Sequence, residues 1–235
     1  NGLPREQRND LMKQTWDMIK DNYMIENREE NKLDDICKKY GGSVTTLHRG
    51  RNRLHTGGDA SKLGYTKIYF EKFSHLQSKS INFLEIGIFQ GKGLALWSEF
   101  FTNAKIYGID IDTTEYNLSK EKLISEYNAF SNNNIEKVFE TNTCEKDQNV
   151  FDELPMIDIL IDDGAHDHKS QHSTFVNYFS KINNGGMYVI EDIREFELID
   201  ILRKTISQTP YKECIDDMEV FDFDHGHKLV VITKK

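Results

Sequence analysis

Hydrophobic residues recur along the chain in two alternating patterns, which together predict a sheet covered by helices. Short apolar runs that end in acidic or glycine residues are typical of buried strands, and apolar residues three or four positions apart are typical of helices that bury one face. The predicted strands cover residues 81–86, 106–109, 135–139, 157–161, 187–190, 220–223 and 229–233. The predicted helices between them cover residues 68–77, 94–101, 118–130, 170–182 and 198–206.

This alternation predicts an α/β fold with a doubly wound, mostly parallel sheet. The last two strands are too close in sequence for a parallel crossover, so we expect them to form an antiparallel hairpin at the end of the sheet. Two further helices are expected before residue 41, followed by a basic segment without clear periodicity. We therefore expect an N-terminal region of helices and basic loop at 1–66 and an α/β domain at 67–235.

The composition narrows the classes of partner. The chain has 235 residues, with 39 acidic and 30 basic side chains and a formal net charge of −9, which argues against general binding to nucleic acid. No apolar run reaches the roughly 18 residues of a membrane span. Three widely spaced cysteines without a signal peptide favour a reducing, cytoplasmic setting. Because the chain begins with Asn1 rather than Met, we expect it to be part of a longer polypeptide.

Candidate ligand-binding residues follow the first three predicted strands, because ligands of such sheets bind beyond the carboxyl ends of the strands. The glycine spacing after the first strand differs from the fingerprint of a dinucleotide-binding site. In addition, the carboxylate of Glu85 would repel a pyrophosphate, whereas it suits the amino group of S-adenosylmethionine. Asp110 follows about twenty residues later, well placed to accept hydrogen bonds from ribose hydroxyls. A bound nucleoside is favoured over a purely structural turn. The candidates at these strand ends are Glu85, Gly87, Gly91, Asp110, Asn142 and Thr143.

A second group of acids follows the fourth and fifth predicted strands. Asp163, Glu191 and Asp192 end strands that we expect to be neighbours, and carboxylates close together repel one another. A hard divalent cation, Mg²⁺ above all, removes this repulsion and leaves open positions for substrate oxygens. The alternative is that single acids cap helices or pair with Arg194 or Lys169.

Histidines lie near two of these segments. His166, three residues after Asp163, is the candidate general base, because an unperturbed histidine titrates near neutrality. A surface or packing histidine is the alternative. His225 and His227 form a His-x-His pair in the predicted hairpin turn, where we expect them to be exposed to solvent.

These motifs together resemble the metal-dependent, S-adenosylmethionine-dependent sugar O-methyltransferases that act on macrolide sugars, with their relatives once named cephalosporin hydroxylases. The resemblance covers more than half of the chain, and its last two blocks are the most specific. The matching blocks are residues 56–59, 64–66, 83–87, 107–110, 162–166 and 185–192.

The resemblance implies a Rossmann-like class I methyltransferase fold and roles for single residues. It implies that Asp163, Glu191 and Asp192 are the metal ligands and that His166 is the base, with Asp163 beside it as a catalytic residue. Ala165 stands where the family often has Ser, which leaves these ligands untouched. The cofactor pocket implied in this way contains Glu85, Gly87, Asp110, Tyr65 and Thr66.

The function predicted from the sequence is Mg²⁺-assisted methyl transfer from S-adenosylmethionine to a sugar hydroxyl, such as that of a deoxyhexose in a glycoside. The alternatives are a catechol-type O-methyltransferase, a nicotinamide-dependent oxidoreductase and a non-catalytic sugar- or nucleotide-binding module. The resemblance leaves the acceptor and a homo-oligomeric state open. The basic segment with Arg49, Arg51 and Arg53 either closes over the cofactor or binds an anionic part of the acceptor, or it is a solvated connector.

Overall fold

The computed structural model describes residues 31–40, 65–194, 196–223 and 227–235. The chain divides into two compact units, Asn1–Asn31 and Lys32–Lys235, and all described helices and strands belong to the second. The first predicted helix and the basic segment Arg49–Arg53 lie outside the described residues. None of the described helices combines the length and the apolar composition of a membrane span.

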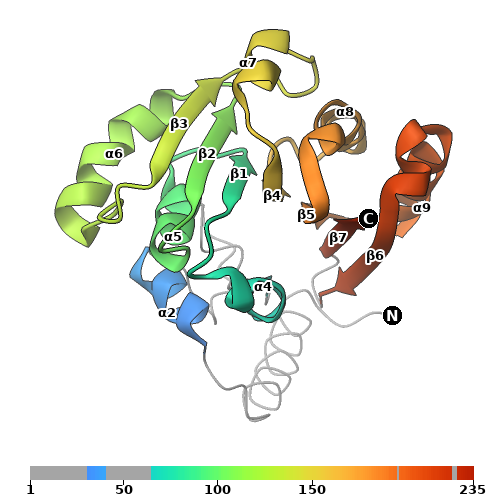
Figure 1. The fold of residues 1–235 in the computed structure, drawn as a ribbon. Coiled ribbons are helices and arrows are strands. Elements are labelled where there is room, and N and C mark those ends of the chain that lie inside the picture. The colour runs from blue at the N-terminus through green and yellow to red at the C-terminus, as the bar shows by residue number, and fades with distance from the viewer. Residues whose placement is uncertain (1–30, 41–64, 195, 224–226) are drawn as a thin grey trace, which may run out of the picture. The chain divides into compact units, whose positions relative to one another are not determined.

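A seven-stranded sheet forms the centre of the described part of the second unit (Figure 1). The strands stand in the order β3-β2-β1-β4-β5-β7-β6. Strands β1 to β5 pair in parallel, and β7 runs antiparallel between β5 and β6. This confirms the predicted mostly parallel sheet with an antiparallel C-terminal hairpin. The strands are β1 Asn82–Ile86, β2 Lys105–Asp110, β3 Ile135–Glu140, β4 Ile157–Asp162, β5 Ile182–Ile193, β6 Ile215–Asp222 and β7 Lys228–Lys234.

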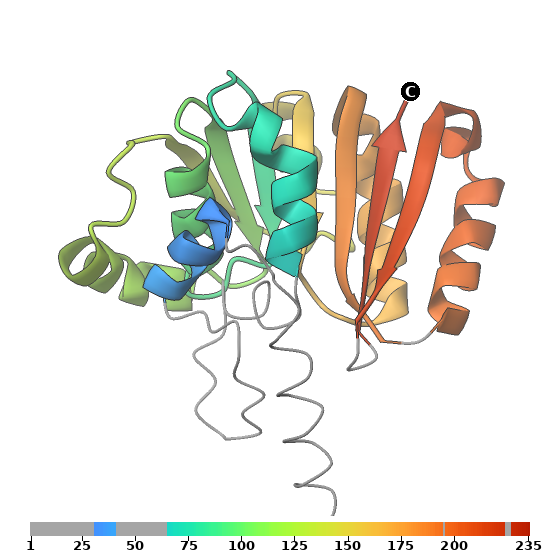
Figure 2. The same ribbon diagram turned by 90° about the horizontal axis from the view of Figure 1, so that it is seen from below.

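Helices cover both faces of this sheet (Figure 2) because side chains alternate across each strand. Phe83 and Ile159 belong to one core cluster with α2, α4, α5 and α6, whereas the next residues, Leu84 and Leu160, belong to a second cluster with α7, α8 and α9. The helices are α2 Lys32–Lys39, α4 Tyr65–Phe73, α5 Lys92–Phe100, α6 Thr114–Tyr127, α7 Gln148–Glu153, α8 His168–Tyr178 and α9 Phe196–Gln208. Short 3₁₀ turns cover Ser74–Leu76, Phe179–Lys181 and Pro210–Cys214.

The predicted elements are found with shifted ends, and one helix was missed. Helix α7 is only six residues long, too short for a periodic signal, and it depends on its cap: the Asp147 side chain accepts hydrogen bonds from the backbone N–H groups of Asn149 and Val150. Strand β5 begins five residues before the predicted strand at 187, because the glycine segment is an irregularity inside the strand rather than a separate turn: Gly185 has a φ of +77°, and the register with β4 shifts there.

Helix α2 packs in the same core cluster as α4 and α5, although we grouped it with the N-terminal region. The Thr66 hydroxyl of α4 donates a hydrogen bond to Asp34 Oδ1 of α2 at 2.5 Å. The Tyr40 hydroxyl, just after α2, donates to Glu99 of α5 at 2.8 Å. The division of the chain at residue 66 into an N-terminal region and an α/β domain stays a prediction.

Candidate active site

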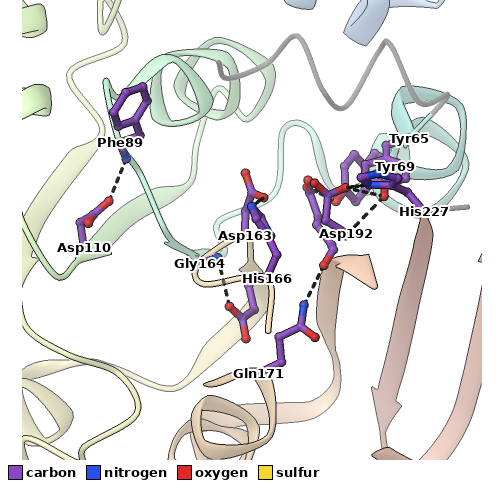
Figure 3. A network of polar contacts seen from close by, with 12 residues as sticks. Tyr65, Tyr69, Phe89, Asp110, Asp163, Gly164, His166, Gln171, Asp192 and His227 are labelled. Atoms are coloured by element: carbon purple, nitrogen blue, oxygen red, sulfur yellow. Dashed lines mark hydrogen bonds and ion pairs between the residues drawn. The ribbon is translucent and has the colours of Figure 1, made fainter. Parts of the chain in front are cut away.

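The carboxyl ends of β1, β4 and β5 meet at one edge of the sheet and bring predicted site residues together (Figure 3). In the strand register, Ile86 of β1 lies opposite Asp162 of β4, which lies opposite Ile190 of β5. The Asp163 backbone N–H then donates to the Ile86 carbonyl at 2.9 Å. The prediction that the fourth and fifth strands are neighbours is confirmed, and it places Asp163 near Asp192.

Asp163, His166 and Asp192 each offer a ligand atom, and these three atoms lie within 4.8 Å of one another. His166 Nε2 is 3.9 Å from Asp163 Oδ1, and these two side chains are 33% and 28% exposed. Asp192 is buried. The cluster therefore has a side open to solvent, formed by Asp163 and His166, and a buried side formed by Asp192.

Glu191, the third predicted metal ligand, lies beside this cluster and is not part of it. Its Oε1 accepts a hydrogen bond from the Tyr69 hydroxyl, and its backbone carbonyl accepts one from Gln171 Nε2 at 3.0 Å. The side chain is buried. The groups that could bind a metal ion in this cluster are therefore two carboxylates and one imidazole. A role of Glu191 as a metal ligand stays a prediction.

Asp192 has an unusual backbone and two hydrogen-bond donors on one of its carboxylate oxygens. Its φ is +56°, which few residues other than glycine adopt. Its Oδ1 accepts hydrogen bonds from the Tyr65 hydroxyl and from His227 Nδ1, each at 3.0 Å. Burial raises the pKa of Asp192, but the hydrogen bond from His227 and the charge of His166 outweigh it, so the pKa lies below its ordinary value. Asp192 is therefore an ionised acid at neutral pH.

The position of His227 corrects the sequence-based expectation that it is exposed to solvent. Its side chain is 28% exposed, and because an ionised Asp192 only accepts, Nδ1 of His227 carries the hydrogen. The topology explains this contact: β7 runs antiparallel to β5, so the residue just before β7 lies at the carboxyl end of β5. His225 lies outside the described residues.

Tyr65 and Tyr69 are buried one turn apart on α4, and sequence reasoning missed their contacts with the acids. Burial and the neighbouring carboxylates raise the pKa of both hydroxyls, so both stay hydrogen-bond donors. The available signal was the spacing of four, which puts two hydroxyls on one helix face. Both Tyr65 and Thr66 have partners inside the protein, and their contact with a cofactor stays a prediction.

Glu85, at the end of β1, is a buried carboxylate with an unused acceptor. Burial raises its pKa to about 8; a hydrogen bond with Trp97 lowers it and the charge of Asp110 raises it. Among the described residues, no donor reaches its Oε2. A Cβ at Gly93 would lie 2.1 Å from its Oε1, so the carboxylate packs against the start of α5. A cationic or N–H donor would satisfy the free oxygen.

Glycines allow the close approaches at this edge. Gly87 has a φ of +86°, and a Cβ there would lie 2.2 Å from the backbone oxygen of Asp163, so a larger residue would separate the ends of β1 and β4. Gly91 precedes α5 with a φ of +78°, and a Cβ there would lie 2.4 Å from the ring of Tyr116. Both are structural requirements of the turn, and a role in cofactor binding is a further prediction.

The other predicted cofactor residues are held by local hydrogen bonds. Asp110 Oδ2 accepts from the backbone N–H of Phe89 at 2.8 Å, which ties the end of β2 to the turn after β1 (Figure 3). The Thr143 and Thr174 hydroxyls are 2.9 Å apart. The Asn142 side chain accepts from a backbone N–H two residues later at 3.1 Å. These bonds fix the loops at the strand ends, and contacts with a cofactor stay predictions.

Comparison with known proteins finds similar sequences, although no protein-family model matches the chain. The chain is 25% identical over 191 aligned positions to the 8-demethyl-8-(2-methoxy-alpha-L-rhamnosyl)-tetracenomycin-C 3'-O-methyltransferase of Streptomyces olivaceus, covering 74% of this chain and 46% of that protein. It is 29% identical over 140 positions to the demethylmacrocin O-methyltransferase of Streptomyces fradiae, covering 55% and 31%. The chain thus spans less than half the length of these curated relatives.

Solved structures show the same fold. The MycE methyltransferase from the mycinamycin biosynthetic pathway, in complex with Mg and SAH (S-adenosylhomocysteine), superposes with a TM-score of 0.60 at 20% identity, over 88% of this chain and 56% of that one. An rRNA methylase from Streptococcus thermophilus superposes with a TM-score of 0.51 at 11% identity, over 71% and 94%.

The chain therefore has the Rossmann-like class I methyltransferase fold, as predicted. Its named curated relatives are O-methyltransferases, and the names of several contain a rhamnosyl or olivosyl sugar, which confirms the resemblance drawn from the motifs.

Proposed function

We propose that this chain is the catalytic region of an S-adenosylmethionine-dependent O-methyltransferase that acts on a sugar hydroxyl with the help of a divalent cation. The observation that carries the proposal is the gathering of Asp163, His166 and Asp192 within 4.8 Å at the carboxyl edge of the sheet. The rhamnosyl and olivosyl groups in the names of curated relatives support a sugar acceptor. A reducing, cytoplasmic setting and a homo-oligomeric state stay predictions.

The donor set fits a divalent cation. Carboxylate oxygens are the ligands that Mg²⁺ prefers, and a site with few protein ligands leaves positions for substrate oxygens. The MycE structure contains Mg, which supports the same cation here. When bound, the cation lowers the pKa of a coordinated hydroxyl. Asp163 and Asp192 would hold it, with Glu191 as the further ligand that the resemblance implies.

His166 is proposed as the base that takes the proton of the acceptor hydroxyl. It lies on the open side of the cluster, where an acceptor enters, and its Nε2 is too far from Asp163 for a hydrogen bond, at 3.9 Å. That nitrogen is free to accept a proton. The negative charge of Asp163 then stabilises the imidazolium.

Glu85 and Asp110 are proposed to hold S-adenosylmethionine, which supplies the electrophilic methyl group. No donor from the described residues reaches Oε2 of Glu85, so this oxygen suits the cationic amino group of the cofactor, and its burial keeps water from competing. Asp110 stands at the end of the next strand, where its carboxylate suits ribose hydroxyls. Both residues bind and orient the cofactor and take no part in proton transfer.

The test is transfer of label from methyl-labelled S-adenosylmethionine to a panel of free and linked deoxysugars and catechols, with Mg²⁺ present. We expect labelled sugar, and we expect a chelator to stop labelling. Label in catechols alone would assign a catechol-type enzyme. Binding of S-adenosylhomocysteine without transfer to any acceptor would favour the binding module, and tighter binding of NAD than of S-adenosylhomocysteine would favour an oxidoreductase.

A further inference from the structure

Three side chains donate hydrogen bonds to the two buried carboxylates at the end of β5. The Tyr65 hydroxyl and His227 Nδ1 both reach Asp192 Oδ1 at 3.0 Å, and the Tyr69 hydroxyl reaches Glu191 Oε1. The tyrosines come from α4 and the histidine directly precedes β7, so segments far apart in the sequence converge here (Figure 3).

These contacts engage only one oxygen of Asp192. Among the described residues, every hydrogen bond to its side chain goes to Oδ1, and none goes to Oδ2. Two donors on one oxygen fix the plane and direction of the carboxylate. The second oxygen is thereby left for a ligand.

The backbone of Asp192 is held by the same tyrosine. The Asp192 N–H donates to the Tyr65 hydroxyl at 3.4 Å, and the residue keeps a φ of +56°. The pairing of β5 with β7 shifts register between Ile190 and Ile193, which takes Asp192 out of the regular ladder. A conformation of this kind persists only where the surroundings over-determine it, and such residues cluster at functional sites.

Packing links the two donors of Asp192 to each other. The Tyr65 ring lies edge-on against Phe223 at the end of β6, with 4.7 Å between ring centroids. The Phe223 N–H in turn donates to the His227 carbonyl at 3.1 Å. Tyr65 is completely buried, so it has no freedom to move away from the acid.

We infer that Tyr65 and His227 are positioning residues that hold Asp192 so that its Oδ2 faces the divalent cation, and that Tyr69 holds Glu191 in the same way. Groups of this kind behind metal ligands set ligand orientation, and their loss typically lowers metal affinity 10–100-fold. The resemblance placed Tyr65 near the cofactor instead. The inference rests on the proposed metal site, but it concerns cation binding and does not need methyl transfer.

The experiment measures Mn²⁺ binding to the full chain by electron paramagnetic resonance, without cofactor or acceptor. Tyr65→Phe and His227→Ala should each weaken Mn²⁺ binding about 10–100-fold. Affinity for S-adenosylhomocysteine should stay within about twofold. His227→Asn, whose amide N–H can replace the Nδ1–H donor, should recover most of the loss, which a purely structural role of the ring would not predict.

Tyr40→Phe is the matched control, because it also removes a buried tyrosine hydroxyl that donates to a carboxylate, Glu99, but not at this site. It should leave Mn²⁺ affinity unchanged. An equal loss in Tyr40→Phe, or unchanged affinity in Tyr65→Phe and His227→Ala, would overturn the inference. If the wild-type chain bound no Mn²⁺, the metal site and the inference would both fail. If the variants behaved as expected but no acceptor were methylated, only the proposed function would fail.

Discussion

Glu85 and Asp192 are two acids at the carboxyl ends of strands in one sheet, about equally buried, at 5% and 7% exposed. Their surroundings give them opposite properties. Burial raises the pKa of Glu85 to about 8, and one of its oxygens lacks a donor among the described residues. The pKa of Asp192 lies below its ordinary value in spite of burial, because His227 and Tyr65 donate to it and His166 lies nearby.

The difference shows that burial alone does not determine whether an acid at the strand ends is ionised. The hydrogen-bond donors and charges around the acid determine it. Asp192 is ionised before any ligand arrives, which suits a site that must attract a cation. Glu85 is largely protonated at neutral pH in the unliganded chain, so we expect it to ionise when a cationic ligand provides the missing partner.

The largest effect is expected from removal of the cation or of the Asp192 charge. Asp192→Asn keeps the shape of the side chain but removes the charge, so turnover should fall to the level seen with excess EDTA. Mg²⁺ should restore the EDTA-treated wild type but not the variant. Calorimetry should show S-adenosylhomocysteine binding largely intact, because Glu85 is untouched. Full activity in excess EDTA would make the acid cluster structural.

His166→Ala should lower turnover by about 10²–10⁴-fold, the range that a positioned general base contributes. Cation and cofactor binding should persist, since neither depends on the base. Measurement of Mn²⁺ affinity alongside kcat separates the two roles open to this imidazole. A loss of Mn²⁺ binding as large as the loss of kcat would assign His166 as a ligand instead.

Asp110→Ala should weaken S-adenosylhomocysteine binding by about 10–100-fold, because a hydrogen bond to a charged acceptor contributes roughly 1.5–3 kcal/mol. Calorimetry of the variant gives the change directly. Glu115→Ala, which removes an exposed acid of α6, is the control and should bind as the wild type does. Equal affinities of Asp110→Ala and the wild type would remove Asp110 from the cofactor site.

A separate effect concerns the stability of the chain, which should depend on pH. The pKa of Glu85 rises from an ordinary value of 4.5 to about 8 on folding, so the folded chain binds this proton more tightly than the unfolded chain. The resulting stabilisation is full below pH 4.5 and is lost as the pH rises through 8, at up to about 1.4 kcal/mol per pH unit.

Glu85→Gln should flatten this slope, measured by chemical denaturation across the pH range, whereas Glu115→Gln should leave it unchanged. Saturation with S-adenosylhomocysteine should flatten it as well, if its amino group is the partner of Glu85. An identical slope in Glu85→Gln and the wild type would contradict the raised pKa.

The sequence was sufficient to predict the site residues that follow strands. Apolar runs show where each strand ends, and parallel pairing implies that these ends lie at the same side of the sheet. Sequence reasoning placed Asp163 near Asp192 in this way. It missed His227 because the contact depends on β7 lying next to β5, which the pattern of strands along the chain does not determine. It missed Tyr69 because helical periodicity identifies a buried face but not the target of a hydroxyl on that face.

The place of β7 between β5 and β6 imposes an order on assembly during synthesis. Strand β5 pairs with β4 on one edge, and its other edge is covered by β7, whose residues leave the ribosome after those of every other strand in the sheet. Until then one edge of β5 stays open, which is a site of aggregation, and β6 lacks β7, its partner in the sheet. His227 arrives with the same segment. A nascent chain therefore gains the contact of His227 with Asp192 and the covering of β5 in one late event.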